Sequence, residues 1–558
     1  MSNGDAGEAL DPIRLGILWD RLISICDEIV EGLVRTSFSS IVREGYDVSV
    51  VLFDRDGRMF AQGNRSIPVF IGTAPTMIRN MLSKFPPDTL ADGDIIVTND
   101  PVHGTGHLFD LSVLQPVFRR GERIGYTMTI THLPDIGGMG FSAAATESFH
   151  EGLFIPVCKL YDAGRLNRFV IELIASNVRT PEQVIGDVMA NVGANRLGAR
   201  QLVEFMDDYG VDDLGPVSAA VRRQSEEAVR QRLRSLPDGV YRSHVDFEGP
   251  DGPLKLACTA TKTGDALAID FAGSSGCVRS GINVPLCYSR AMALHAVKCL
   301  MAPTIPNNEG TAAPVTVTAP EGSILNAVRP WPSAGRHVVG HFVPPLVNAA
   351  LADVLPEDVQ ADCGMADIVT FHGVRPDGGP MATLFFLAGG FGALSGLDGQ
   401  STTPGPSNMS VIPVEVWESR TGITVLEKRL LPDSGGPGAF RGGLGQEVSL
   451  RNDTGHPLKV FSMANRWRFP AAGLMGGGAG RLREHRVNGR TVPATGTAIL
   501  SPGDVFTLVE AGGGGFGDPR TRAREAVARD LALGFVTPEA AREIYAFDAD
   551  GPATGAGA

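Results

Sequence analysis

Cysteine is scarce in this sequence, and its spacing forms no metal-binding pattern. Seven cysteines are scattered over 558 residues, and no two of them stand in a Cys-x-x-Cys spacing. A zinc ribbon needs such pairs, so this class of site is excluded. The odd number and the scatter are typical of structural thiols in a reducing compartment, and we expect a cytoplasmic location.

Long apolar runs are also lacking. No segment approaches the roughly 18 uninterrupted apolar residues that predict a membrane-spanning helix. The N-terminal segment MSNGDAGEALDP does not have the basic, apolar and small-residue order of a signal peptide. The formal net charge of −13 argues against nucleic acid or an anionic membrane surface as a partner. We therefore expect a soluble globular chain with no membrane and no nucleic-acid partner.

Several nucleotide-binding and nucleophile motifs are missing. The chain has no GxSxG elbow and no GxGxxG after a strand, so serine hydrolases and dinucleotide enzymes have no support. The run Gly512–Gly517 lacks the lysine and the following Ser/Thr of a phosphate loop, which favours glycine turns between strands. If the reaction needs ATP, no segment of this chain obviously supplies the site.

Glycine is abundant, with 69 residues beside 38 prolines. It is not periodic but clustered, at 388–392, 434–438, 441–445, 476–478 and 512–517. Apolar runs separate these clusters, so we expect tight turns and irregular loops in a folded body rather than disorder.

Hydrophobic periodicity predicts both helices and strands. The expected helices are 12–37, 181–206, 217–236, 287–301 and 520–533, and the expected strands include 47–53, 94–98, 239–247, 254–261 and 266–271. We expect a mixed α+β fold in which an N-terminal α/β metal-binding region precedes a glycine-rich, strand-rich C-terminal half. The expected divisions are 1–235 (mixed α/β with the metal site), 236–405 (central α+β) and 406–558 (strand-rich with terminal helices).

Histidines and carboxylates concentrate between positions 103 and 150. Four of the eleven histidines lie there, and the phrases Asn99–Asp110 and His132–Gly138 place three aspartates among them. Imidazole and carboxylate side chains together are the usual ligands of a divalent metal, whereas few other roles need both at this density.

The stretch between the two phrases reads as a β-hairpin. Residues 111–118 and 123–131 are β-branched and aromatic, and the turn between them contains Gly121. If the turn centres on Gly121, Asp110 lies opposite His132, with Cβ atoms roughly 4.5–5.5 Å apart. His107 lies three residues before Asp110 in a glycine-rich loop, so register alone predicts a cluster of His107, Asp110 and His132. A slip of one residue would turn one ligand to the other face of the sheet.

Other readings of these residues stay open. Histidine and aspartate near strand ends also cap turns or bond to the backbone. His337 and His341 are four residues apart, but Gly340 and the following prolines argue against a regular helix, so a structural role and a substrate or metal contact are both retained. Glu151 is a candidate carboxylate behind the metal ligands, before an expected strand at 152–157.

These residues resemble the hydantoinase B/oxoprolinase family over nearly the whole chain. Each matching phrase is weak by itself, but their order spans more than 400 residues. In chain order they are Val42–Glu44 with Asp47, Leu52–Asp54, Asn99–Pro101, His107 with Asp110, His132 with Asp135–Gly138, Glu151–Leu153 with Ile155–Pro156, Asn308–Gly310, Pro413–Glu415, Pro432–Gly436, Arg441–Gly445 and Gly512–Pro519.

The resemblance implies a partner and a reaction. Such B-type subunits work with a larger A-type subunit that binds ATP and phosphorylates a carbonyl oxygen of the substrate. Hydantoinase and oxoprolinase members then hydrolyse a cyclic amide, whereas related carboxylases of acetone and acetophenone add activated bicarbonate to a ketone. In the acetone carboxylase relatives a metal is held at the positions that match His107, Asp110 and His132.

We therefore interpret the chain as the B-type subunit of an ATP-dependent cyclic amidohydrolase in a hetero-oligomer. His107, Asp110 and His132 would hold a divalent ion, either zinc, manganese or iron. Asp135 would orient a ligand histidine or act as general base, and Asp100 and His103 are further candidates for base or substrate contact.

Two departures from the commoner family pattern keep alternatives open. Phe70 and Leu133 stand where many members have histidine, and if both face the site they make it drier. A dry site suits a ketone carboxylase, because activated bicarbonate must be protected from water. A further alternative is a non-catalytic structural subunit, which a closed four-ligand metal site would favour.

Overall fold

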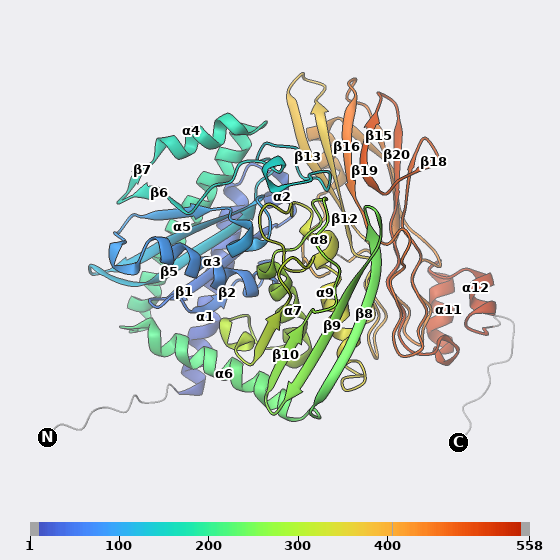
Figure 1. The fold of residues 1–558 in the computed structure, drawn as a ribbon, viewed down its shortest axis with the longest axis horizontal. Helices are drawn as coiled ribbons and strands as arrows, with labels where there is room; N and C mark the ends of the chain where they lie inside the picture. The colour runs from blue at the N-terminus through green and yellow to red at the C-terminus, as the bar shows by residue number, and fades with distance from the viewer. Residues whose placement is uncertain (1–10, 404, 548–558) are drawn as a thin grey trace.

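In residues 11–403 and 405–547, which the computed structural model describes, the chain forms four β-sheets that helices cover and connect (Figure 1). The predicted mixed α+β class is confirmed. The helices are α1 (Pro12–Thr36), α2 (Ser40–Arg43), α3 (Phe70–Lys84), α4 (Arg168–Asn177), α5 (Pro181–Asp208), α6 (Leu214–Arg234), α7 (Leu286–Met301), α8 (Arg336–Gly340), α9 (Val343–Leu351), α10 (Val414–Thr421), α11 (Arg524–Ala532) and α12 (Pro538–Glu543). Over these residues, no helix combines the length and the apolar character needed to cross a membrane.

The first sheet holds the N-terminal half together. Its order is β2-β1-β5-β4-β3-β6-β7, with β1 (Val48–Asp54), β2 (Met59–Gln62), β3 (Ile95–Thr98), β4 (Asp110–Arg119), β5 (Glu122–His132), β6 (Cys158–Asp162) and β7 (Arg165–Leu166). Val48, Val50 and Leu52 pack in the same core cluster as α1, whereas Val51 and Phe53 join the cluster that contains α3 and α7. Both faces of this sheet are therefore buried, and polar residues at its strand ends become buried as well.

Helix α1 follows directly from local sequence signals. The Asp11 carboxylate accepts a hydrogen bond from Arg14 N at 3.0 Å, and Pro12 occupies the first helical position. Leucine and isoleucine then recur at helical spacing and are buried against α5 and β1. The predicted helix at 12–37 is confirmed, as are those at 181–206, 217–236 and 287–301 to within a few residues.

The hairpin of β4 and β5 has the predicted pairing of Asp110 with His132, although its turn is centred elsewhere and one strand contains a bulge. The turn is centred between Arg120 and Gly121, both at positive φ, as a two-residue hairpin turn requires. A bulge at Val117/Phe118 then shifts the pairing by one residue. The two displacements cancel, and Asp110 pairs with His132.

The second sheet and its helices form the middle of the molecule. Its order is β11-β10-β9-β8, with β8 (Gly239–Gly249), β9 (Gly252–Thr263), β10 (Ala266–Asp270) and β11 (Val315–Thr318). Helix α9 packs on β8 and β9, and α7 connects α9 to α3. The strands predicted at 239–271 are confirmed, but residues 152–157 lie outside any strand, because pairing with β3 starts only at Cys158.

Two further sheets make up the C-terminal side. The third has the order β13-β12-β16-β19, and the fourth β14-β15-β20-β17-β18. Their strands are β12 (Ala366–Val374), β13 (Pro380–Ala388), β14 (Ile423–Leu430), β15 (Gln446–Asn452), β16 (Leu458–Met463), β17 (Glu484–Val487), β18 (Arg490–Val492), β19 (Thr495–Leu500) and β20 (Val505–Val509). The division expected near 235 falls between α6 and β8, and the one expected near 405 falls between strands of the third sheet.

The glycine clusters lie side by side in what we call the glycine bundle, residues 389–393, 434–445, 471–481 and 511–517. Its segments bond to one another outside the regular sheets: Gly443 N donates to Phe391 O, Gly513 N to Gly443 O, and Gly436 N to Gly513 O. A Cβ at Gly512 would overlap the carbonyl oxygen of Ser434. The expected irregular loops in a folded body are present, but for most of these glycines close backbone approach, rather than a tight turn, is what requires glycine.

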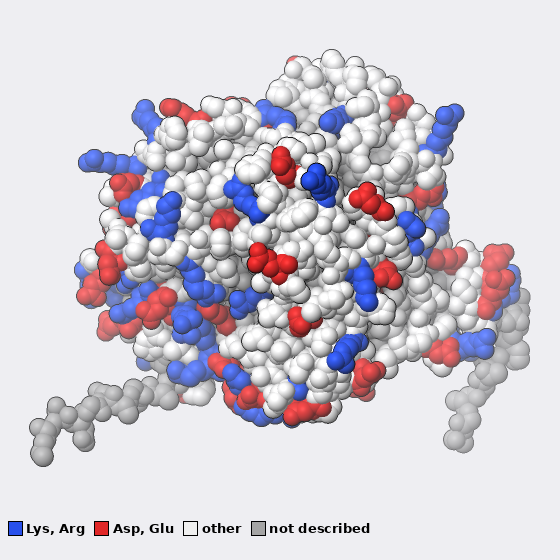
Figure 2. Space-filling view, viewed as in Figure 1, with Lys and Arg blue, Asp and Glu red and all other residues white. Residues whose placement is uncertain are grey.

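The charged side chains are mixed over the face drawn in Figure 2. Lysine and arginine alternate there with aspartate and glutamate, over a largely uncharged surface. Such a face has no broad region of one sign that would attract a polyanion.

Candidate metal centre

His107, Asp110 and His132 come together at one end of the β4–β5 hairpin. Asp110 begins β4, His132 ends β5, and His107 lies in the loop that follows a kinked turn, Pro101–Thr105. All three side chains are buried, and a ligand atom of each lies within 4.8 Å of the others. The structure thus brings together the three residues that register predicted.

The shared carboxylate oxygen of Asp110 is the centre of this cluster. His107 Nε2 lies 2.9 Å from Asp110 Oδ1, and His132 Nδ1 lies 3.3 Å from the same atom. The rings of His107 and His132 have centroids 5.2 Å apart. Nitrogen and oxygen ligand atoms at such separations can converge on one divalent ion.

The hydrogen bonds around His107 fit a metal ligand. Its Nδ1 lies 3.0 Å from Ala334 O, and because a carbonyl oxygen only accepts, Nδ1 carries the proton and Nε2 has a free lone pair. Nε2 of His107 and Nε2 of His132 are buried and make no hydrogen bond of acceptable geometry, although His107 Nε2 lies 2.9 Å from Asp110 Oδ1. Metal-binding histidines commonly donate their other ring N–H to a backbone carbonyl, so the donor set fits a divalent cation.

The electrostatics of the cluster keep the ligands in the forms that bind metal. Burial, together with the charge of Arg336, lowers the pKa of His107 to about 4, so the imidazole is neutral. Burial opposes ionisation of Asp110, but the positive charge of Arg336 helps to hold the pKa of this carboxyl well below its usual range. A neutral imidazole and an ionised carboxylate are the required protonation states.

Arg336 at the start of α8 fixes the far side of Asp110. Its Nη2 lies 2.7 Å from Asp110 Oδ2, and its Nε donates to Thr105 O at 2.5 Å. Its guanidinium also lies over the ring of Tyr288, 4.2 Å from the centroid. One oxygen of Asp110 is thus held by Arg336 while the other faces the histidines. No sequence pattern identified Arg336, because it lies 226 residues away in the chain.

A cavity of about 60 Å³, here called the inner cavity, opens beside the cluster. Phe70 and Tyr288 contribute apolar surface to its lining, while Leu133 is buried outside it. The apolar character expected from Phe70 is therefore present, whereas Leu133 bonds through its backbone to Phe109 O.

Asp47 also lines the inner cavity; the sequence placed it in a phrase that matches the family but gave it no role. It directly precedes β1, its Oδ2 lies 3.7 Å from His132 Nδ1, and burial raises its pKa to about 6. Val48 pairs with Thr131, which puts Asp47 next to His132. The available signal was the alternating strand at 47–53, but recognising it required knowing that this strand neighbours β5.

His337 and His341 face the same inner cavity from α8 and the residue after it. The ring of His337 stacks on Phe141 with centroids 5.5 Å apart, and neither of its nitrogens has a hydrogen-bond partner. Burial lowers the pKa of His341 to about 3 and that of His337 well below its ordinary value. The Gly340 objection to a helix was wrong for this short turn, since Tyr288 packs where a Cβ at position 340 would lie.

The structure places Asp135, Asp100 and His103 outside the lining of the inner cavity. Asp135 is buried, and its Oδ1 accepts hydrogen bonds from Arg179 Nη1 at 2.7 Å and Gly137 N at 3.1 Å. Asp100 caps the turn before His107 through Val102 N, and its Oδ2 lies 3.0 Å from His103 Nδ1. The His103 side chain is 59% exposed. Their predicted catalytic roles remain predictions, with these contacts as the observed ones.

Glu151 supports the loop that contacts His107. Its Oε1 accepts hydrogen bonds from Ser333 N at 2.6 Å and Ala334 N at 2.5 Å. Ala334 O in turn accepts the His107 Nδ1–H bond, so Glu151 is two contacts from the cluster. Burial raises the pKa of Glu151 to about 8, which favours its protonated form.

A second buried group, Asp367, His485 and Glu510, joins the third and fourth sheets. His485 Nε2 lies 2.7 Å from Asp367 Oδ2, and Arg483 Nη2 lies 2.8 Å from Glu510 Oε2. Burial raises the pKa of Glu510 to about 8, and the nearby Asp367 adds to this. The group therefore links the two sheets through buried pairs, His485 with Asp367 and Arg483 with Glu510.

Comparison with known proteins shows the family to which the chain is similar. The hydantoinase B/oxoprolinase family pattern matches residues 11–519. The B component of the putative D-/L-hydantoinase of Pseudomonas sp. (strain NS671) is 30% identical, with 96% of this chain and 95% of that protein aligned. The beta chain of the caprolactamase of Pseudomonas jessenii is 31% identical, with 97% of each chain aligned.

Two solved structures share the fold of this chain. The ATP-dependent caprolactamase structure from Pseudomonas jessenii has a TM-score of 0.90 at 28% identity and covers 98% of both chains. The nucleotide-free structure of acetone carboxylase has a TM-score of 0.86 at 21% identity and covers 96% of this chain and 79% of that one, a likeness that shows the fold alone. From the match over residues 11–519 and the similarity to these relatives, the chain belongs to the hydantoinase B/oxoprolinase family.

Proposed function

We propose that this chain is the B-type subunit of an ATP-dependent cyclic amidohydrolase, acting on a cyclic amide that a partner A-type subunit activates. The observation that carries the proposal is the buried His107–Asp110–His132 cluster that opens on the inner cavity. The hydantoinase and caprolactamase relatives, each named as one component of a larger enzyme, support the substrate class and the partner. The ATP in the name of the caprolactamase structure supports the energy source.

His107, Asp110 and His132 would hold the divalent ion, whose identity among zinc, manganese and iron is open. When bound, such an ion supplies Lewis-acid chemistry and lowers the pKa of a water molecule. The chain's own contribution is orientation: Ala334 O fixes the His107 ring, and Arg336 fixes the Asp110 carboxylate. Phe70, Phe141 and Tyr288 limit water around the reacting carbonyl.

Asp47 is the proton acceptor that the geometry favours. It lines the inner cavity beside His132, whereas both Asp135 and Asp100 have other partners and lie outside the lining. We therefore assign Asp47 the general-base role, and assign Asp135 to holding the loop after His132 through Arg179.

The non-catalytic alternative has a structural counter-argument. A structural metal site is closed by four protein ligands, whereas this cluster has three and faces a cavity. An open position of this kind suits catalysis.

Elemental analysis and a turnover assay test the proposal. Purified chain should contain close to one equivalent of divalent metal, and the His107→Ala/His132→Ala variant should lose it, while the exposed His456→Ala control keeps it. The complex with an A-type subunit should open a lactam or hydantoin with ATP in bicarbonate-free buffer. Full metal occupancy in the double variant would contradict the ligand assignment. Turnover of a ketone that strictly requires bicarbonate would replace the hydrolase with the carboxylase.

A further inference from the structure

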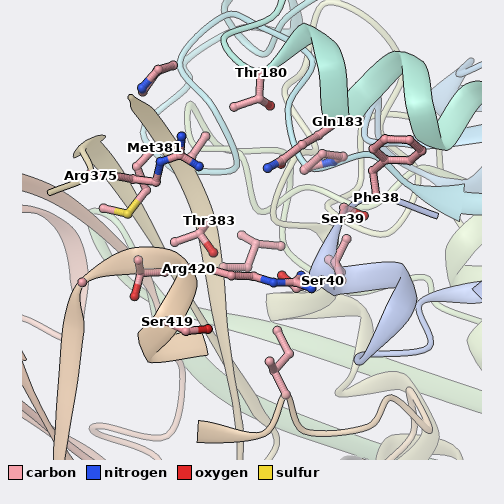
Figure 3. Close-up of a pocket in the computed structure, with 18 of the residues that line it drawn as sticks. Phe38, Ser39, Ser40, Thr180, Gln183, Arg375, Met381, Thr383, Ser419 and Arg420 are labelled. Carbon is pink, nitrogen blue, oxygen red and sulfur yellow. The ribbon is translucent and has the colours of Figure 1, made fainter. Parts of the chain in front are cut away.

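A larger cleft, here called the outer cleft, adjoins the inner cavity. It encloses about 490 Å³ between α2 and α5 on one side and β13 and α10 on the other (Figure 3). Ile41, Leu384 and Ile412 line both the outer cleft and the inner cavity. These three apolar side chains, here called the wall, therefore lie between the outer cleft and the inner cavity with its His107–Asp110–His132 cluster.

The volumes of the two cavities determine which part of a cyclic substrate each can hold. The inner cavity of about 60 Å³ is far below the roughly 300–1,000 Å³ range of small-molecule sites, so it does not hold a whole lactam or hydantoin ring. The outer cleft of about 490 Å³ lies inside the roughly 300–1,000 Å³ range of small-molecule sites. A cyclic substrate can place its amide group in the inner cavity only if most of the ring stays in the outer cleft or at the wall.

The lining of the outer cleft is polar but not cationic in sum. Ser39, Ser40, Thr383, Ser419 and Gln183 line it with hydroxyl and amide groups (Figure 3). Such groups offer hydrogen bonds to an uncharged polar ring.

Both arginines of the cleft have carboxylate partners. Arg420 reaches across the cleft toward Ser40, and its Nη2 lies 3.2 Å from Glu44 Oε1 (Figure 3). Arg375 Nε lies 3.2 Å from Asp377 Oδ1. Glu418 also lines the cleft, so the lining carboxylates Asp377 and Glu418 equal the two arginines in number. An anionic ligand would have to compete with carboxylates for both arginines, which favours a neutral ligand.

We propose that the outer cleft binds the ring of an uncharged cyclic amide. Ile41, Leu384 and Ile412 form a constriction through which the amide group reaches the candidate metal ligands in the inner cavity. The inference rests on the proposed function for the identity of the ligand, but not for the existence of the constriction. Ile412 lies in a segment without helix or strand, which a hydrogen bond from Ser410 N to Gly45 O at 2.8 Å attaches to the N-terminal half. Of the three wall residues it has the least regular backbone support.

Access can be measured without turnover. Diethyl pyrocarbonate reacts with neutral imidazole, and mass spectrometry of the full-length chain can follow its reaction with His337 and His341, which line the inner cavity. We expect Ile412→Ala and Leu384→Ala to raise these rates several-fold, and Ile412→Trp to lower them. The exposed His456 is the internal standard, and Ile499→Trp, at a position 61% exposed on β19, is the matched control. Unchanged His337 and His341 rates in all three wall variants would overturn the constriction.

Ligand class can be measured in the complex with the A-type subunit. 2-Pyrrolidone and 5-oxoproline share one ring and differ by a carboxylate, so their kcat/KM ratio reports charge selection directly. We expect at least a tenfold preference for 2-pyrrolidone in the wild type, and a larger loss for caprolactam than for 2-pyrrolidone in Ile412→Trp. A preference for 5-oxoproline would overturn the neutral-ligand assignment.

The two measurements also separate this inference from the proposed function. Ring opening by the wild type with unresponsive histidine rates would overturn the constriction and leave the hydrolase standing. Responsive histidine rates without ring opening of any cyclic amide would overturn the hydrolase and the ligand class, and leave the constriction standing.

Discussion

Asp47 and His132 lie side by side at the ends of two neighbouring strands, β1 and β5, with Asp47 Oδ2 3.7 Å from His132 Nδ1. Because Val48 pairs with Thr131, this proximity is built into the register of β1 on β5. A carboxylate beside a candidate metal ligand and inside the cavity is placed to accept a proton from the attacking water.

The first prediction compares two aspartates. Asp47→Asn should lower kcat by about 10² or more, the usual contribution of a general base, with little change in unfolding temperature. Asp135→Asn should instead weaken the bond to Arg179 and lower the unfolding temperature. Steady-state kinetics and thermal unfolding of both variants provide the measurement. A larger kcat loss in Asp135→Asn would return the base to Asp135.

The second prediction concerns the buried ion pair of Arg336 and Asp110. Arg336→Met leaves the Asp110 carboxylate buried with the guanidinium removed, and breaking such a pair from one side costs about 3–5 kcal/mol of unfolding free energy. Urea denaturation measures this loss. The double variant Arg336→Met/Asp110→Asn should recover a good part of it, since no unpaired charge remains. A double variant as unstable as the single one would contradict the pairing.

The third prediction is a pH dependence of stability from Glu151. Its pKa is raised from an ordinary 4.5 to about 8, so folding favours the protonated form. The resulting stabilisation is complete below about pH 4.5 and is lost as the pH rises through about 8. Glu151→Gln keeps a neutral side chain that accepts from Ser333 N and Ala334 N. Its unfolding temperature should therefore fall less than that of the wild type between about pH 6 and 9, and parallel curves would refute the assignment.

The fourth prediction uses two glycines with opposite surroundings. Gly512→Ala places a methyl group on the carbonyl oxygen of Ser434, and we expect a loss above about 3 kcal/mol, the upper end of ordinary overpacking, because backbone cannot yield as a side chain does. Gly193 lies in α5 with open space around its Cβ position, so Gly193→Ala should stabilise the chain by about 0.5–1 kcal/mol. Chemical denaturation of both variants is the measurement, and equal effects would contradict the packing.

The sequence was sufficient to predict that His107, Asp110 and His132 lie together, because their proximity depends on local features. Asp110 and His132 belong to one hairpin, and two small errors in its turn and its bulge cancelled. Amphipathic helices such as α1 and α5 were predictable for the same reason, since periodicity and caps act over a few residues.

The remainder of the site depends on contacts between distant segments. Arg336 bonds to Asp110 across 226 residues, and Arg420 bonds to Glu44 across 376 residues. No period or motif relates residues so far apart in the chain. The outer cleft, and the part of the inner cavity that Arg336 lines, could therefore not be predicted. The role of the clustered glycines could not be predicted either. Glycine permits both a tight turn and close approach of two backbones, and composition does not distinguish the two.

The glycine bundle has a consequence for how the C-terminal part of the chain folds. Its segments run from about position 389 to 517, and each satisfies its backbone groups largely on another segment. None of them buries side chains enough to be stable by itself, so partial assembly leaves unpaired peptide groups and gains little. Closure of long chain segments must come before the stabilising contacts, which predicts slow, all-or-none formation of this part of the molecule. Hydrogen exchange should accordingly find the amides of Gly443, Gly513 and Gly515 opening together, in one cooperative unit, despite their separation in the chain.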